Sequence, residues 1–178
     1  MARIFSAIDI EDEETLEKLE HIRDTLDLGF KPVNKEKMHI TLQFFQDLDE
    51  EEIQKVEEGL QNIDVEPFNA KIAELGAFPS EDYIRVIWAG IEHPKIYEIQ
   101  EKASKHDVES DDHHEFKPHI TLLRVENMSR KQKKKVKKTI DEYRDTEIGE
   151  IKIDKVKLFK SEHRNGKTEY TEIAEKKL

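Results

Sequence analysis

Apolar and polar positions alternate in the same way in two short stretches of the chain, Met38-His39-Ile40-Thr41-Leu42 and Pro118-His119-Ile120-Thr121-Leu122. Alternation with a period of two is typical of a half-buried β-strand, in which successive side chains point to opposite faces. Ile and Leu then share one face of each strand, and His and Thr share the other. The two copies stand 80 residues apart, so the pattern predicts one site built from two matching halves.

The rest of the chain alternates between strand and helix patterns. Period-two alternation predicts strands near residues 3–8, 68–72 and 84–88 and in the region after residue 147. Spacing of three and four residues predicts helices, the first beginning at an Asp9 N-cap and burying Leu16, Leu19, Ile22 and Leu26. Asp47 or Asp49 is expected to cap the second helix, Pro94 to begin the third, and Ser129 to cap the fourth.

Two turns and one bend are predicted between these elements. Gly76 to Pro79 reads as a turn, and a change of parity between Ile153 and Val156 predicts a bulge near Asp154. Asn165-Gly166 is typical of a two-residue hairpin turn. That turn would pair Leu158 with Ile173 and Ser161 with Tyr170.

Most of these elements repeat at the same 80-residue offset, which is the mark of an internal repeat. We therefore expect an α+β fold with two pseudo-symmetric lobes, each an antiparallel sheet with helices on its outer face, around a central groove. The expected organisation is a single bilobal domain, 1–178, with an internal repeat of about 1–80 and 81–178. Strands that cross between the lobes are compatible with it.

Composition narrows the function classes. The 178 residues carry a formal net charge of −11 and no cysteine, which excludes disulfides, thiolate catalysis and cysteine-based zinc sites. No signal or membrane-spanning segment is visible, so we expect a cytoplasmic monomer without a membrane partner. The acidic total argues against a non-specific nucleic-acid binder. However, residues 130–138 contain seven Lys and Arg side chains and no acidic residue. They either bind an RNA backbone or form a solvated helix face.

Two facing histidines can divide the work of acid and base catalysis, because an imidazole pKa near 6.5 allows one ring to be protonated while the other is neutral. Opening a phosphodiester needs that division: one ring takes a proton from water and the other gives one to the departing sugar oxygen. Thr41 and Thr121 can donate to the phosphoryl oxygens. A five-membered cyclic phosphate is already strained, so the mechanism requires no metal and no cofactor.

Several of these residues have other interpretations. A lone His-x-Thr is usually a surface pair, but two copies in matched context are far above chance expectation. His113, His114 and His119 could suggest a metal cluster, although adjacent side chains in an extended loop point apart. Phe45, Phe116 and Tyr170 could stack a terminal base or simply pack.

The paired His-x-Thr motifs, together with Arg3 to Asp9, Phe116 to Val125 and Ser161 to Tyr170, resemble the RNA 2′,3′-cyclic phosphodiesterases of the 2H phosphoesterase superfamily, first named 2′-5′ RNA ligases. The resemblance covers essentially the whole chain. It implies metal-independent opening of RNA 2′,3′-cyclic phosphate ends, or of small cyclic nucleotides, to a 2′-phosphate, with reversible 2′-5′ ligation known in the family. It also implies His39 as proton donor and His119 as proton acceptor.

The chain departs from the family pattern in two places. Gln43 and Gln46 stand where the family often has Lys and Gly, which puts substrate affinity in question more than chemistry. Arg124 matches a family arginine, yet strict alternation puts it on the face away from His119, so a substrate-binding role requires a twist or a bulge. The competing function class is a binding module that holds a nucleotide or RNA end in the same groove without turnover.

Overall fold

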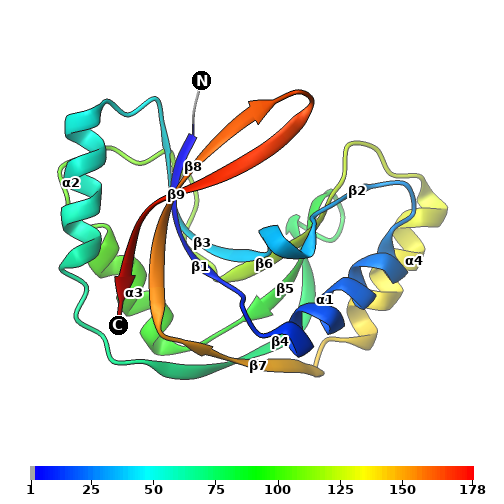
Figure 1. Cartoon of the computed structure of the whole chain (residues 1–178). Helices are drawn as coiled ribbons and strands as arrows, with labels where there is room; N and C mark the ends of the chain where they lie inside the picture. The colour runs from blue at the N-terminus through cyan, green and yellow to red at the C-terminus, as the bar shows by residue number, and fades with distance from the viewer. Residues whose placement is uncertain (1–2) are drawn as a thin grey trace.

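A computed structural model describes residues 3–178 of the chain (Figure 1). In chain order its elements are β1 (Arg3–Asp9), α1 (Glu13–Leu26), β2 (Lys31–Pro32), the 3₁₀ turn η1 (Lys35–Lys37), β3 (His39–Gln46), α2 (Glu50–Gln61), β4 (Phe68–Pro79), β5 (Ile84–Ile91), α3 (Pro94–Ala103), β6 (His119–Arg124), α4 (Arg130–Glu142), β7 (Glu147–Ile153), β8 (Lys155–Arg164) and β9 (Lys167–Lys177). The α+β class is confirmed.

The strands of the two halves join into one antiparallel sheet with the order β7-β4-β5-β6-β3-β1-β8-β9, and β2 pairs with β6. The halves meet where β3 pairs with β6, and the residues paired there are Ile40 and Ile120. These residues occupy equivalent positions of the two repeats. The pseudo-two-fold axis therefore passes beside this residue pair, between the two His-x-Thr motifs.

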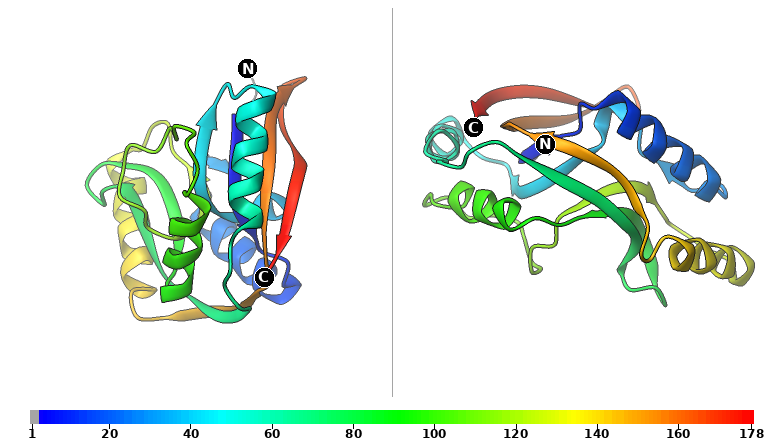
Figure 2. Two further views of the ribbon diagram at one scale, coloured as in Figure 1. Left: turned by 90° about the vertical axis from the view of Figure 1, so that its left-hand side faces the viewer. Right: turned by 90° about the horizontal axis from the view of Figure 1, so that it is seen from below.

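The helices are exchanged between the halves. Helix α1 follows the first strand of the chain but contacts β6 and β7 of the second half, whereas α3, from the second half, contacts β3. Figures 1 and 2 show the result as two helix pairs, α2 with α3 and α1 with α4, at opposite ends of the molecule. Each half of the sheet is thus covered by one helix from each repeat. Neither repeat can therefore bury the apolar face of its strands without the other.

One large apolar cluster holds the helices to the sheet. The predicted stripe of α1, Leu16, Leu19, Ile22 and Leu26, is buried, as are the matching pairs Val56 and Leu60 of α2 and Val136 and Ile140 of α4. Full burial of such a side chain contributes about 1.5–3 kcal/mol. The period of these apolar positions therefore explains both the helices and the faces that they bury.

The helix N-caps follow the expected chemistry, with one correction. Asp49 and Ser129 each close a capping box at the start of α2 and α4. Asp9 does not cap α1; Asp12 does, accepting a hydrogen bond from the Thr15 backbone N–H at 2.9 Å. The prediction for Asp9 was wrong because β1 continues through Asp9, whose carboxylate pairs with Lys157 at 3.1 Å.

Two further predictions need correction. Gly76 to Pro79 is not a turn but the end of β4, which pairs with β5 as far as Ile84. Gly76 is required there because a Cβ would lie 2.2 Å from the indole ring of Trp88.

In the β8–β9 hairpin, Asn165 and Gly166 have the expected positive φ, and Ser161 pairs with Tyr170 as predicted. A bulge beyond that pair moves Leu158 opposite Ala174 instead of Ile173.

The predicted bend near Asp154 is confirmed as the break between β7 and β8. These strands follow each other directly in the chain but lie far apart in the sheet order, because β7 pairs with β4 and β8 pairs with β1. Among residues 3–178 no helix combines the length and the apolar character needed to cross a membrane.

Candidate active site

The two histidines lie on one face of the sheet, on adjacent strands. Because Ile40 pairs with Ile120 in an antiparallel sense, His39 stands opposite Thr121, and His119 opposite Thr41. His39 and His119 are then diagonal neighbours, which in a regular ladder are about 7–8 Å apart. Such a separation leaves room for one phosphate between two imidazole rings. We call this side of the sheet the histidine face.

A backbone carbonyl orients each imidazole. His39 Nδ1 lies 2.7 Å from the Lys37 carbonyl oxygen, and His119 Nδ1 lies 2.7 Å from the Lys117 carbonyl oxygen. A carbonyl can only accept, so Nδ1 carries a proton and donates it in both rings. Proton exchange with a ligand is therefore left to Nε2 of each histidine, by the same device in both repeats.

The threonines differ in their present partners. Thr41 Oγ1 lies 3.0 Å from His39 Nε2 and donates its hydroxyl proton to that nitrogen when the ring is neutral. No equivalent contact joins Thr121 to His119 within residues 3–178. Both threonines are half-buried on the histidine face, where their hydroxyls can also donate to a bound anion.

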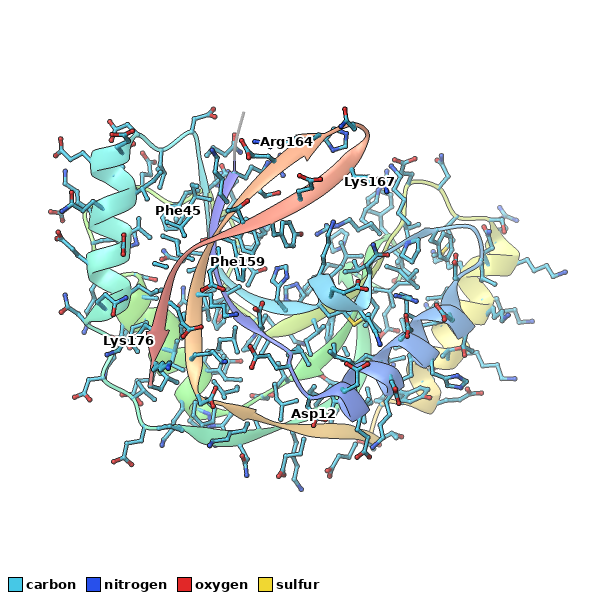
Figure 3. All side chains as sticks on the ribbon, in the orientation of Figure 1. Asp12, Phe45, Phe159, Arg164, Lys167 and Lys176 are labelled. Carbon is cyan, nitrogen blue, oxygen red and sulfur yellow. The ribbon has the colours of Figure 1, made fainter. Side chains whose placement is uncertain are left out.

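Aromatic side chains surround the His39 ring. Phe5 stacks on it with ring centroids 5.0 Å apart, and Tyr170 meets it edge-on at 5.8 Å. Phe159 stacks on Phe5 with ring centroids 5.3 Å apart; it belongs to β8, in the same hairpin whose tip carries Arg164 and Lys167 (Figure 3). These contacts fix the plane of the imidazole from two sides.

His119 has a different but comparable support. Phe78 meets its ring edge-on, with centroids 4.8 Å apart, and Trp88 lies 6.2 Å away. The Lys117 ammonium sits 4.5 Å above the Trp88 ring. The second repeat therefore holds its histidine between aromatics and a nearby cation.

Burial lowers the pKa of both histidines. It lowers the pKa of His39 to about 4, and the positive charges of Arg124 and His119 act in the same direction. It also lowers the pKa of His119, with Arg124 and Lys117 adding to the effect. Both rings are therefore neutral at pH 7 without a ligand, whereas an unperturbed pKa near 6.5 would allow one of them to be protonated. An anion bound between them would raise both pKa values.

Matching β-bulges follow the two His-x-Thr motifs. In the β1–β3 ladder, Thr41 and Gln43 pair with consecutive residues of β1, which leaves Leu42 as the extra residue. In the β5–β6 ladder, Leu122 is the extra residue in the same way. A bulge reverses the alternation beyond it, so Phe44 and Arg124, also 80 residues apart, turn toward the histidine face.

The bulge resolves the position of Arg124. Its charge lowers the pKa of His39, of His119 and of Tyr170, so the guanidinium faces both rings. In the described part of the chain no carboxylate forms an ion pair with it. Arg124 is thus an exposed cation beside two neutral imidazoles, which suits an anionic ligand.

Phe44 occupies the equivalent position in the first repeat. It is 36 % exposed, and its ring centroid lies 5.7 Å from that of Phe5. An exposed aromatic next to the His39 pocket can offer a stacking surface. Phe45, considered for that role from the sequence, is fully buried and packs against His106 on the helix side, toward α2 (Figure 3).

Each bulged strand is covered by a loop from the other half of the chain. Asp111 N–H donates to the Phe44 carbonyl at 2.8 Å, and Asp112 accepts from the Phe44 N–H at 3.3 Å. Lys31 pairs with Arg124 through β2. The loops that flank the site therefore place carboxylates beside Phe44 and a lysine beside Arg124.

The remaining candidates lie elsewhere. Gln43 is buried and contacts His106 at 3.2 Å, on the side away from the histidines, and Gln46 contacts Asp111 of the loop beside Phe44. His113 is 3.4 Å from Asp111, and His114 is exposed. Residues 3–178 hold no group of three or more His, Asp or Glu side chains placed to bind a metal ion.

Sequence reasoning missed Phe44, and it missed Phe5, Phe78 and Trp88 as the aromatic walls of the site. One signal was present: two successive apolar residues, Leu122 and Leu123, interrupt the alternation before Arg124. Such a doublet is what a bulge requires. The aromatic walls have no comparable signal, because they come from other strands.

A family model described as "LigT like Phosphoesterase" matches residues 8–88 and 92–168. Two relatives named "RNA 2′,3′-cyclic phosphodiesterase" are similar to the chain: one from Methanocaldococcus jannaschii is 35% identical, covering 89% of this chain and 91% of the relative, and one from Methanothermobacter thermautotrophicus is 32% identical, covering 90% of each.

Two solved structures have the same fold. TT0787 of Thermus thermophilus superimposes with a TM-score of 0.77 at 24% identity, covering 99% of this chain and 97% of that one. Escherichia coli LigT complexed with 3′-AMP superimposes with a TM-score of 0.72 at 22% identity, covering 99% and 96%.

Proposed function

The chain belongs to the LigT-like phosphoesterase family, and we propose that it hydrolyses the 2′,3′-cyclic phosphate at the end of an RNA, or of a small cyclic nucleotide, to a 2′-phosphate, using His39 and His119 as acid and base without a metal. The observation that carries the proposal is the pair of imidazoles. Each donates Nδ1–H to a backbone carbonyl, which leaves two Nε2 atoms beside Arg124 for proton transfer.

The reaction divides between the two rings as follows. His119 Nε2 takes a proton from a water molecule, whose oxygen attacks phosphorus. The bond from phosphorus to the ribose 3′ oxygen breaks, and protonated His39 gives its Nε2 proton to that oxygen. The product carries a 2′-phosphate and a free 3′-hydroxyl, and exchange of one proton with solvent resets both rings. The assignment of donor and acceptor follows the resemblance to the family.

Burial sets a condition on this scheme. His39 is neutral at pH 7 in the empty site, since its pKa lies near 4, and a neutral ring with a proton on Nδ1 has none to give from Nε2. Binding of the anionic substrate raises the pKa of His39 and allows it to take up a proton. We therefore propose that the bound phosphate causes His39 to become protonated, while Arg124, Thr41 and Thr121 bind the phosphate oxygens.

Phe44 supplies the other part of the substrate site. Its exposed ring lies on the His39 side, where the terminal base can stack, and such stacking does not depend strongly on which base is present. We propose that the base of the cyclic end lies against Phe44 and its phosphate lies toward Arg124. The same site would join a 2′-5′ bond when the 5′-hydroxyl of a second RNA replaces water as the nucleophile, since the bond from phosphorus to the 3′ oxygen breaks in the same way.

The test is incubation with a 2′,3′-cyclic mononucleotide in the presence and absence of EDTA, followed by separation of the 2′- and 3′-phosphate products. The expected result is chelator-resistant formation of the 2′-phosphate alone. Binding of the cyclic nucleotide without turnover would replace the enzyme with a binding module, and loss of activity in EDTA would overturn metal independence.

A further inference from the structure

Helices α2 and α4 occupy equivalent places in the two repeats but carry opposite charge. Both start with a capping box, and Val56 and Leu60 of α2 are buried where α4 buries Val136 and Ile140. Helix α2 has Glu50, Glu51 and Glu52 in its first turn, and α4 has Arg130, Lys131 and Lys133 at or next to the matching positions. The fold therefore does not require the cations of α4.

The cations of α4 are unfavourable for the helix itself. Positive side chains in the first turn oppose the helix dipole, which favours acids there. Several of them also repeat at four-residue spacing, as Arg130 and Lys134 do, which places like charges next to each other. The stability of the helix therefore does not explain why it carries seven such residues in a chain with a net charge of −11.

Most of this charge is free to bind a partner. Asp82 accepts from Lys133 and Lys137, and Lys138 lies 4.0 Å from Glu142. The side chains of the other four cations form no hydrogen bond or ion pair among residues 3–178; we call them the α4 cations: Arg130, Lys131, Lys134 and Lys135. All four are exposed. Arg130 and Lys134 also line a shallow hollow that runs along the helix.

The α4 cations begin a short distance along the chain from Arg124, the cation of the active site. Arg124, at the end of β6, is followed after five residues by α4. Its strand partner is Lys31, whose ammonium forms an ion pair with Glu126 of the β6–α4 connection. Gln132 of α4 donates to the Leu28 carbonyl at 2.8 Å, which fixes the start of α4 beside the loop that leads to β2. Figure 1 shows β2 and this end of α4 on the same side of the molecule.

The opposite end of the site is acidic. Asp111 and Asp112 flank Phe44, and Asp47 and Asp49 follow β3. A polyanion that leaves the histidine face would therefore pass Arg124 rather than Phe44. Helix α4 has 13 residues, so it offers a strip about 20 Å long.

We propose that the α4 cations bind the phosphodiester backbone of the RNA upstream of the cyclic end, so that α4 selects RNA over mononucleotides. This inference rests on the proposed function, since it extends the substrate from its terminal nucleotide toward the 5′ side. The contacts are to phosphates and carry no base preference. The cyclic end of the RNA would then bind on the histidine face, and the RNA backbone upstream of it would bind on α4.

The experiment compares the wild type with a variant in which all four α4 cations are replaced by Gln, using a single-stranded RNA that ends in a 2′,3′-cyclic phosphate and a 2′,3′-cyclic mononucleotide. We expect kcat/KM for the RNA to fall at least about tenfold at 50 mM salt, and the slope of log affinity against log salt to become shallower by about 3. Turnover of the mononucleotide should be unchanged. A matched control removes four exposed lysines elsewhere, Lys55, Lys71, Lys152 and Lys177.

The outcomes are distinguishable. Equal losses on RNA and mononucleotide, or equal losses in the variant and the matched control, would overturn the proposal. Vesicles of anionic lipid that compete with RNA and lose their binding in the variant, with RNA turnover unaffected, would assign α4 to a membrane surface instead. RNA with a 2′-phosphate end is used for anisotropy binding, so failure of the proposed hydrolysis would leave the α4 measurement valid.

Discussion

The two repeats differ most where they face the substrate, and least where they support it. His39 and His119 share the same motif, the same carbonyl contact and the same following bulge. Beyond the bulge the residues diverge: Phe44 in one repeat and Arg124 in the other. The shared scaffold therefore places the two histidines that we propose as proton-transfer groups symmetrically, and the divergent positions give the site an aromatic end and a cationic end.

The largest expected effect comes from the shared part. His39→Ala and His119→Ala should each lower kcat for a cyclic mononucleotide by about 10²–10⁴-fold, because each removes a proton-transfer group. A cyclic phosphate with sulfur in place of the 3′ bridging oxygen separates the roles, since a thiolate leaves without protonation. Steady-state kinetics should then show a smaller loss for His39→Ala and an unchanged loss for His119→Ala.

Opposite behaviour would exchange the two roles. If the sulfur substrate rescues His119→Ala and not His39→Ala, then the donor lies in the second repeat, and the strongly lowered pKa of His39 marks the base. Circular dichroism serves as the control for folding of both variants.

The divergent positions should give smaller and separable effects. Arg124→Ala removes charge-assisted hydrogen bonds worth about 1.5–3 kcal/mol, so kcat/KM should fall about 10–150-fold for every cyclic substrate. Phe44→Ala removes stacking worth about 1–3 kcal/mol, an effect confined to substrates that have a base. Cyclic phosphate on a ribose without a base is therefore the discriminating substrate.

If Phe44→Ala lowers kcat/KM for the base-free ribose as much as for a nucleotide, then Phe44 does not stack the base but supports His39 through Phe5. Arg124→Lys is the matched variant for the other end, because it keeps the charge and removes the planar fork. Partial activity in Arg124→Lys is the expected result; activity equal to that of Arg124→Ala would show that geometry, and not charge, is required.

The pH dependence tests whether the substrate raises the imidazole pKa values. The profile of kcat/KM reports the free enzyme. His119 must be neutral to act as the base, and because its pKa is lowered, the rise of kcat/KM with pH should occur below pH 6.5. His39 must be protonated to act as the donor, so kcat/KM should decline above the pKa of His39, near 4. The maximum of kcat/KM should thus lie below pH 6.5, and the maximum of kcat, which reports the bound state, at higher pH. Coincident maxima above pH 7 would contradict this account.

The sequence predicts the symmetric features well because they depend on local pattern. His39, Thr41 and their repeats are visible as alternation, and Leu60 or Ile140 as helical period. Arg124 could not be placed from strict alternation, because the bulge at Leu122 depends on how β5 and β6 pair. Phe44 was overlooked in favour of Phe45 for the same reason. The capping role of Asp9 failed because its partner, Lys157, arrives from a strand late in the chain.

The pKa values of the histidines illustrate a second limit. An unperturbed imidazole pKa allows one charged and one neutral ring near pH 7. The residues that change this expectation, Phe5, Tyr170, Phe78 and Arg124, come from four separate strands. Burial and charge at a site are sums over the assembled fold. They follow from the sequence only after the fold is known.

The smallest effect concerns the helices that differ in charge. Replacing Arg130 and Lys131 by Glu, as in α2, removes two cations from the positive end of the α4 dipole and should raise the free energy of unfolding by about 0.3–1 kcal/mol per site at low ionic strength. The gain should vanish at high salt, because exposed charges are screened. Urea denaturation at both salt concentrations measures it, and the reciprocal Glu50→Arg, Glu51→Lys change in α2 should have the opposite sign. A loss of stability in the α4 variant would mean that these cations support the fold, and the argument from the charge difference to RNA would fail.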